Sequence, residues 1–132
     1  MKPSKFALIF LVACGSAVGG LLRYLISIGL NPFAELFPWA TFAVNLLGSF
    51  LIGVLFVWCA RFQAEQKLRA LLIVGLMGGL TTFSSFSLEA DGLIHTGRAG
   101  LALLYVFLSV VLGILGVFLG MSLMRLRGRK IK

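Results

Sequence analysis

The chain has 132 residues, of which 60% are hydrophobic and only 12% are charged, and its mean hydropathy is +1.07. This composition is far from that of soluble domains and indicates an integral membrane protein of one compact domain. The formal net charge of +8 does not indicate a nucleic-acid-binding protein, because the basic residues gather at the ends of apolar runs.

Four uncharged, strongly apolar runs divide the chain. Each predicts a transmembrane helix, because about 20 apolar residues span the hydrocarbon core of a bilayer. The expected helices cover residues 6–30, 38–61, 68–89 and 99–124, so the predicted fold is an all-α membrane protein with one four-helix domain over residues 1–132. The first run also resembles a secretory signal, but hydrophobicity resumes after Gly15 and favours a membrane helix.

The basic residues predict how these helices are oriented. Four spans place the N-terminus, the second connection and the C-terminal tail on one side of the membrane. Ten of the twelve basic residues fall on that side: Lys2, Lys5, Arg61, Lys67, Arg69, Arg125, Arg127, Arg129, Lys130 and Lys132. By the positive-inside rule, both termini are expected in the cytoplasm.

Small residues recur at the spacing of helix-packing motifs in membranes. Pairs four residues apart occur in each expected helix: Gly15 and Gly19, Ser49 and Gly53, Gly75 and Gly79, and Gly116 and Gly120. Such pairs let the backbones of neighbouring helices approach closely. They predict tight packing between the spans, and because four helices make only a thin bundle, an oligomer is expected.

Polar side chains lie at membrane depth, where they are costly and therefore indicate function. They are Arg23 in the first span and, at four-residue spacing on the second and fourth spans, Thr41, Asn45, Ser49, Tyr105 and Ser109. No Asp or Glu lies in the middle of a span, since Glu89 is expected at the end of the third. Neutral donors without a titratable carboxylate favour an anion pathway over a proton-coupled pump. The alternative is that these groups bond to the backbone of neighbouring helices.

The third span contains the polar stretch GGLTTFSSFS at residues 78–87. Paired glycines destabilise a helix and Thr hydroxyls can bond to freed backbone, so Gly78 and Gly79 predict a break in this span. Backbone carbonyls at a break are suitable ligands for a small hard cation. Phe83 and Phe86 share a helix face, which fits contact with lipid or core, or a path on which positive ring edges face an anion.

Together these motifs resemble the Fluc/CrcB family of fluoride channels over essentially the whole chain. The resemblance is carried by GSAVGGLLRY at residues 15–24, WATFAVNLLGSFLIG at 39–53, GGLTTFSSFSLE at 78–89, and Tyr105 with Ser109. It implies a passive fluoride channel, not an enzyme, in the bacterial cytoplasmic membrane. It also implies a homodimer of two oppositely inserted copies, with two antiparallel pores and a structural sodium ion between the copies.

The resemblance further implies roles for individual residues. The backbone carbonyls of Gly78 and Thr81 match the sodium ligands. The residues that match the fluoride pore are Thr41, Asn45, Phe83, Ser84, Ser85, Phe86, Tyr105 and Ser109. Arg23 matches a vestibule or structural charge, and Glu89 matches a glutamate to which no role is assigned.

Two other functions compete with this interpretation. Small multidrug or guanidinium exporters have a similar size and topology, but they rely on a glutamate in the first span, and this chain has none there. A non-transporting assembly factor would need only the glycine packing.

The uneven distribution of basic residues departs from the resemblance, because a protein that inserts in both orientations is expected to carry similar numbers of basic residues on its two sides. Either the short basic tail has little influence on the orientation of insertion, or the chain prefers one orientation and needs an oppositely inserted partner.

Overall fold

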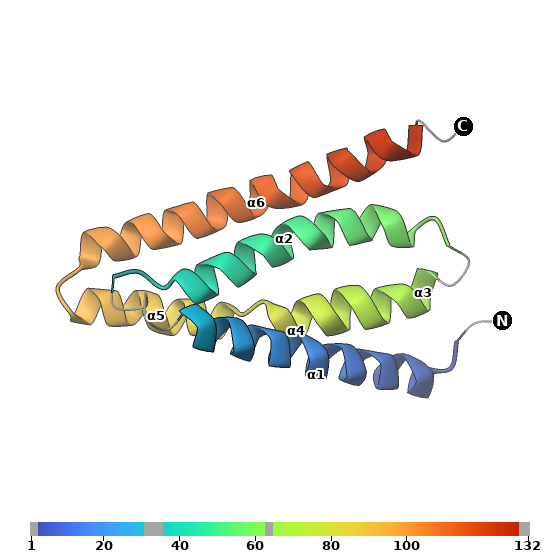
Figure 1. The fold of residues 1–132 in the computed structure, drawn as a ribbon, viewed down its shortest axis with the longest axis horizontal. Helices are drawn as coiled ribbons and strands as arrows, with labels where there is room; N and C mark the ends of the chain where they lie inside the picture. Colours follow the sequence, from blue (N-terminus) through green and yellow to red (C-terminus); the bar gives the residue numbers. More distant parts are fainter. Residues whose placement is uncertain (1–2, 31–35, 63–64, 130–132) are drawn as a thin grey trace.

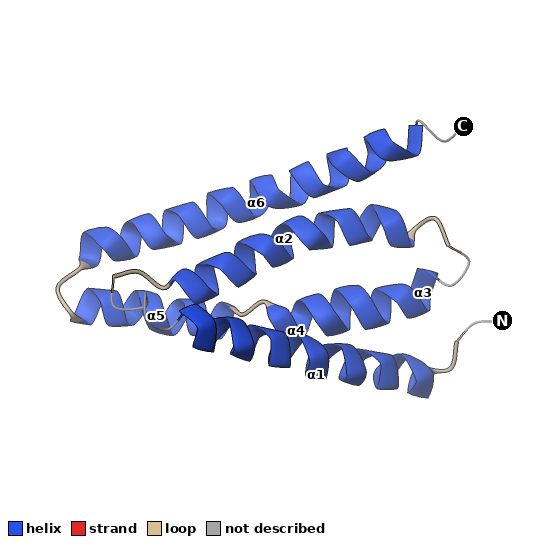
Figure 2. Cartoon of the chain, viewed as in Figure 1, coloured by secondary structure: helices blue, strands red, loops and turns tan. Residues whose placement is uncertain are grey.

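The computed structural model describes residues 3–30, 36–62 and 65–129, and their regular structure is helical throughout (Figure 2). Four helices in these ranges are long and apolar enough to cross a membrane: Lys5–Leu30, Trp39–Cys59, Glu65–His95 and Ala99–Leu126. They lie along one another in an elongated bundle, and the first begins at the same end at which the last finishes (Figure 1). The predicted all-α, multi-pass membrane protein is therefore confirmed.

The third span is assembled from several helical pieces. The elements are α1 (Lys5–Leu30), α2 (Trp39–Cys59), α3 (Glu65–Leu68), the π-helix η2 (Arg69–Met77), α4 (Gly78–Leu80), α5 (Phe83–His95) and α6 (Ala99–Arg129). The first two spans agree with the expected boundaries to within two residues. The π-helix was not predicted, because no residue pattern distinguishes it from an α-helix.

The third span extends further than expected, since its last helix ends at His95 rather than at 89. The fourth span ends at Leu126, within two residues of the expected end, although the helix α6 itself continues to Arg129. The pair Asp91-Gly92 does not stop the third span. The chain reverses only at Gly97, whose φ of 76° favours glycine. As a consequence, Glu89 lies inside α5 and not at its end.

A break divides the third span, but it lies beyond the two glycines that predicted it. Gly78 and Gly79 are helical, whereas Thr81 (φ −84°, ψ 155°) and Thr82 (φ −149°, ψ 125°) are extended. The Thr81 hydroxyl donates to the Met77 carbonyl at 2.9 Å, and the Thr82 hydroxyl accepts from the Ser85 N–H at 3.2 Å. The helix is therefore interrupted where side chains satisfy the freed backbone groups, and Thr82 is the N-cap of α5.

The predicted close packing at small residues is confirmed at two helix crossings. Where α1 meets η2 and α4, a Cβ added to Gly15 would meet the Leu71 carbonyl oxygen, and one added to Gly79 would lie 2.5 Å from the Ser16 carbonyl oxygen. Where α2 meets α6, a Cβ on Gly120 would meet the Phe50 carbonyl oxygen. The bundle therefore consists of two tightly crossed pairs, α1 with the first half of the third span and α2 with α6 (Figure 1).

Two hydrophobic clusters flank the break. One contains Phe37, Phe86, Leu93, Ala102 and Tyr105, and the other contains Val44, Met77 and Leu80. The first joins α5 and α6 to Phe37, which precedes α2, and the second joins α2 to the end of η2 and to α4. The extended residues Thr81 and Thr82 are thus held between two packed regions, and polar groups gather there.

Candidate functional site

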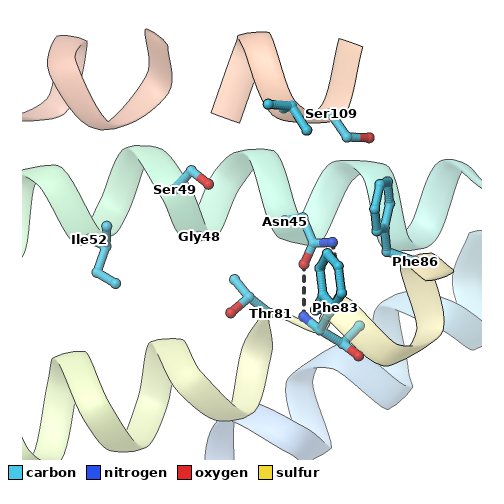
Figure 3. Close-up of a pocket in the computed structure, with 10 residues that line it drawn as sticks. Asn45, Gly48, Ser49, Ile52, Thr81, Phe83, Phe86 and Ser109 are labelled. Carbon is cyan, nitrogen blue, oxygen red and sulfur yellow. Dashed lines mark hydrogen bonds between the residues drawn. The ribbon is translucent and has the colours of Figure 1, made fainter. Parts of the chain in front are cut away.

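A cavity of about 280 Å³ lies beside the break in the third span. It is lined from α2, the break, α5 and α6 by Asn45, Gly48, Ser49, Ile52, Thr81, Thr82, Phe83, Phe86, Ser109 and Val110 (Figure 3). None of these side chains is charged. The lining is a mixture of amide and hydroxyl groups with aromatic rings, as expected of a neutral donor-lined path.

Asn45 contributes both functions of its amide to the break. Its Nδ2 donates to the Thr82 carbonyl at 2.9 Å, and its Oδ1 accepts from the Thr82 N–H at 2.8 Å (Figure 3). Asn45 therefore bonds to the backbone of a neighbouring span, as the alternative to an anion pathway predicted for these polar groups. A carboxamide has two N–H donors and this contact uses one, so Asn45, which lines the cavity, retains a second donor.

Phe83 and Phe86 both face the cavity from the first turns of α5. Their ring centroids are 5.6 Å apart with an interplanar angle of 41°. Phe86 is 9% exposed and packs against Tyr105 at 5.1 Å, whereas Phe83 is 79% exposed at the surface of the chain. Phe86 thus forms a wall of the cavity that packs against the core, and Phe83 forms a wall at the outer surface of this single chain.

The serine hydroxyls differ in their placement. Ser109 Oγ, on α6, is buried, and within residues 3–30, 36–62 and 65–129 no group bonds to it. Ser84 and Ser85 lie outside the cavity lining, where their hydroxyls interact with the Thr82 hydroxyl at 3.1 and 3.3 Å. Ser109 is therefore a donor available to a guest in the cavity, while Ser84 and Ser85 belong to the polar turn that begins α5.

Thr41, Glu89 and Tyr105 form a separate cluster that joins three helices. The Thr41 hydroxyl donates to Glu89 Oε1 at 2.6 Å, and the Tyr105 hydroxyl donates to Glu89 Oε2 at 2.8 Å. Thr41 and Glu89 line a second cavity, of about 400 Å³, at the end of the bundle where Trp39 and Arg98 also lie. The hydroxyls of Thr41 and Tyr105 are thus engaged by a carboxylate whose position inside α5 was not predicted.

Backbone carbonyls at the break are left without their helical partners. The N–H of Thr82, which would reach the Gly78 carbonyl in a continuous helix, donates to Asn45. The N–H of Ser85, which would reach the Thr81 carbonyl, donates to the Thr82 hydroxyl. The Gly79 carbonyl accepts from Arg23 Nε at 3.2 Å. The carbonyls of Gly78 and Thr81 therefore fit the donor chemistry of a small hard cation. In the described part of the chain, no group of three or more His, Cys, Asp or Glu side chains could hold a metal ion.

The site residues predicted from sequence thus fall into four places. Asn45, Phe83, Phe86 and Ser109 meet at the first cavity, Thr41 and Tyr105 meet at Glu89, and Arg23, Gly78 and Thr81 meet at the break. Ser84 and Ser85 lie in the polar turn that begins α5, outside the cavity lining. Thr82 was missed as a site residue. The signal available for it was a threonine that precedes the helical stretch beginning at Phe83, with a serine three residues further on.

The fold and the site define a multi-pass membrane protein whose polar cavity is built at a break in its third span. The chain belongs to the CrcB family, since the family model described as "CrcB-like protein, Camphor Resistance (CrcB)" matches residues 10–121. The family resemblance seen in the motifs is therefore confirmed.

Curated relatives match nearly the full length of the chain. A protein named "Fluoride-specific ion channel FluC" from Novosphingobium aromaticivorans is 49% identical over 118 residues, covering 86% of this chain and 93% of the relative. Proteins of the same name from Agrobacterium fabrum and Hahella chejuensis are 45% identical over 119 and 117 residues, covering 89% and 87% of this chain and 95% and 92% of the relatives.

Proposed function

We propose that this protein is a passive, fluoride-selective ion channel, not an enzyme, that releases fluoride from the bacterial cytoplasm across the inner membrane. The observation that carries the proposal is the uncharged cavity beside the break. It contains the Asn45 amide, two phenylalanine rings and the Ser109 hydroxyl, to which no group in the described part of the chain bonds. The relatives named as fluoride-specific ion channels support the same ion.

The chemistry of the cavity suits a small anion that must pass without being trapped. Amide and hydroxyl donors replace the water around the anion, and the positive edges of the Phe83 and Phe86 rings add a weak attraction. A buried lysine or arginine would hold the ion too tightly for conduction, and the cavity lining contains neither. Glu89 does not line this cavity, and its carboxylate accepts hydrogen bonds from two hydroxyls, those of Thr41 and Tyr105. Because the Thr41 and Tyr105 hydroxyls both donate to Glu89, each hydroxyl can donate to the anion only after it rotates away from the carboxylate.

The proposed assembly is a homodimer of two oppositely inserted copies with two antiparallel pores. The exposure of Phe83 supports this, since a ring that lines the cavity is 79% exposed on a single chain and a second copy would cover it. In the proposed dimer a structural sodium ion would lie between the two copies, and the carbonyls of Gly78 and Thr81 from each copy would bind it. The sodium would supply positive charge at membrane depth and so draw the two broken helices together.

Purified protein in liposomes is expected to release internal fluoride rapidly and to retain chloride. Fluoride loss should not depend on a proton gradient, because the path needs no titratable carrier. A fluoride electrode outside the liposomes measures the release, and a chloride electrode provides the control. The runner-up function, a small multidrug or guanidinium exporter, would instead show proton-coupled movement of an organic cation. A correctly folded protein that releases no fluoride would contradict the proposal.

Phe83→Ile is expected to lower the rate of fluoride release roughly tenfold, which corresponds to the loss of an aromatic contribution of about 1.4 kcal/mol. The substitution keeps an apolar side chain but removes the ring edge that faces the cavity. Leu88→Ile is the matched control, because Leu88 is on the same helix and 73% exposed but does not line the cavity. Equal rates for the two variants would remove Phe83 from the ion path.

Replacing sodium on both sides of the membrane by a large organic cation is expected to reduce fluoride release and to lower the melting temperature of the purified protein. The cause is the loss of the ion that the Gly78 and Thr81 carbonyls are proposed to bind. The measurement is release rate and thermal stability in matched salts of equal ionic strength. A protein indifferent to the exchange in both assays would rule out the proposed sodium site.

A further inference from the structure

The break in the third span exposes backbone groups that need partners at membrane depth. An unsatisfied N–H or C=O costs several kcal/mol in hydrocarbon, where no water replaces the missing bond. At Thr82 both backbone groups are satisfied by one side chain, since the N–H donates to Asn45 Oδ1 and the C=O accepts from Asn45 Nδ2. A carboxamide offers a donor and an acceptor on the same carbon without bringing a charge.

This contact determines what the preceding carbonyl can do. In a continuous α-helix the Thr82 N–H would bond to the Gly78 carbonyl, four residues earlier. Asn45 competes for the same N–H and holds it at 2.8 Å. The backbone at Thr82 is extended rather than helical. The Gly78 carbonyl thus lacks its helical partner, the Thr82 N–H, because a side chain on a different helix accepts from that N–H.

A second contact from α2 seats the neighbouring residue. A Cβ added to Gly48 would meet the Cγ2 methyl of Thr81, so this methyl lies directly on the α2 backbone. The Thr81 hydroxyl is bonded to the Met77 carbonyl, and this bond prevents the methyl from rotating away without loss. Asn45 and Gly48 are three residues apart and therefore share the face of α2 that receives the break.

We propose that Asn45 is a positioning residue for the broken helix, in addition to presenting a donor to the cavity. It holds Thr82 extended, keeps the N–H of Thr82 away from Gly78 and so leaves the Gly78 carbonyl to a cation. With Gly48 it couples the wall of the cavity to the backbone ligands of that ion. The part of this inference that concerns the cation rests on the proposed function, whereas the part that concerns the Thr82 backbone does not.

Amide hydrogen exchange at Thr82 tests the proposal on the full chain in lipid nanodiscs. The Thr82 N–H is expected to be protected in the natural protein although it lies outside any helix. In Asn45→Ala it should exchange about tenfold faster or more, as expected for the loss of one intramolecular hydrogen bond. Ser109→Ala is the matched control, because Ser109 lines the same cavity but its hydroxyl does not bond to the break, and it should leave Thr82 protected. Unchanged exchange in Asn45→Ala would overturn the proposal.

Sodium-dependent melting provides the second readout. The gain in melting temperature on adding sodium chloride, relative to a salt of a large organic cation, is expected to be lost in Asn45→Ala and kept in Ser109→Ala. Gly48→Ala keeps the Asn45 amide but displaces Thr81, so it should also lose the sodium response. If Asn45→Ala does not fold, Gly48→Ala provides the test in its place. A full sodium response in Gly48→Ala would then refute the proposed coupling between α2 and the backbone ligands of the cation. If the natural protein releases no fluoride but Thr82 is protected only when Asn45 is present, the proposed function fails and the positioning role stands.

Discussion

Gly19→Ala is expected to prevent α1 from docking on the third span, whereas Gly20→Ala, one residue further along, is expected to be tolerated. A Cβ at position 19 would meet the Leu76 carbonyl oxygen and would lie 2.8 Å from the Leu80 N, whereas a Cβ at position 20 meets nothing within 4 Å. Both of the obstructing atoms belong to the backbone and cannot rotate away. Overpacking of this kind costs about 1–3 kcal/mol or more, a large fraction of the stability of a small domain.

The measurement is the yield of monodisperse protein in detergent and its melting temperature, with the two variants prepared side by side. The pair is closely matched, because the substitution is the same and both sites lie on α1. Gly20→Ala should behave as the natural protein does, and Gly19→Ala should lose folded protein or melt at a clearly lower temperature. Equal melting temperatures would show that the α1 crossing is looser than the structure indicates.

Tyr105→Phe is expected to destabilise the protein by about 2 kcal/mol, because it leaves an oxygen of the Glu89 carboxylate without its donor. The hydroxyl donates to Glu89 Oε2 at 2.8 Å, and the side chain is fully buried. The ring itself should remain in place, since its contacts with Phe86 and Phe37, at 5.1 and 5.3 Å, do not involve the hydroxyl. The loss therefore reports on the hydrogen bond and not on packing.

A double-mutant cycle with Glu89→Gln separates this bond from other effects. If the hydroxyl acts through the carboxylate, Tyr105→Phe should cost about 1 kcal/mol less when residue 89 is neutral. The free energy of unfolding, measured in denaturant, gives the comparison. Tyr24→Phe serves as the control, because Tyr24 is 63% exposed. Its effect on the free energy of unfolding should be the same whether residue 89 is Glu or Gln. Additive losses would show that Tyr105 and Glu89 are not coupled.

The spans and their crossings could be predicted from the sequence because they depend on properties repeated along the chain. Hydrophobic length predicts four helices, and glycine pairs such as Gly15 with Gly19 predict where backbones approach. Both signals are local to one helix. The end of the third span was less predictable, since the pair Asp91-Gly92 does not stop a helix when later residues continue it.

The location of the break and the connections within the site could not be predicted in the same way. Gly78 and Gly79 weaken the helix, but the chain leaves it at Thr81 and Thr82, where Asn45 supplies hydrogen bonds from another span. Glu89 likewise acquires its partners, Thr41 and Tyr105, from two other helices. Pairings between distant segments depend on the register of helix packing, and no single helix contains that information.

The orientation predicted from charge remains a prediction, although the arrangement of the chain is compatible with it. The start of α1, the end of α2, the start of α3 and the end of α6 lie at one end of the bundle (Figure 1). Of the ten basic residues assigned to that side, Lys2, Lys130 and Lys132 lie outside the described residues. The proposed antiparallel dimer therefore requires that insertion tolerate this bias in one of its two copies.

The claim that fluoride passes through the cavity beside the break is tested most directly by modifying Ser109→Cys with a small, water-soluble thiol reagent during a liposome release measurement. Cys14 is exposed and must first be replaced by serine, whereas Cys59 is buried and, unlike position 109, does not line the cavity. The predicted result is that modification abolishes fluoride release from Ser109→Cys and has no effect on the Cys14→Ser background. Undiminished release from protein whose position 109 is shown by mass spectrometry to be fully modified would contradict a path through this cavity.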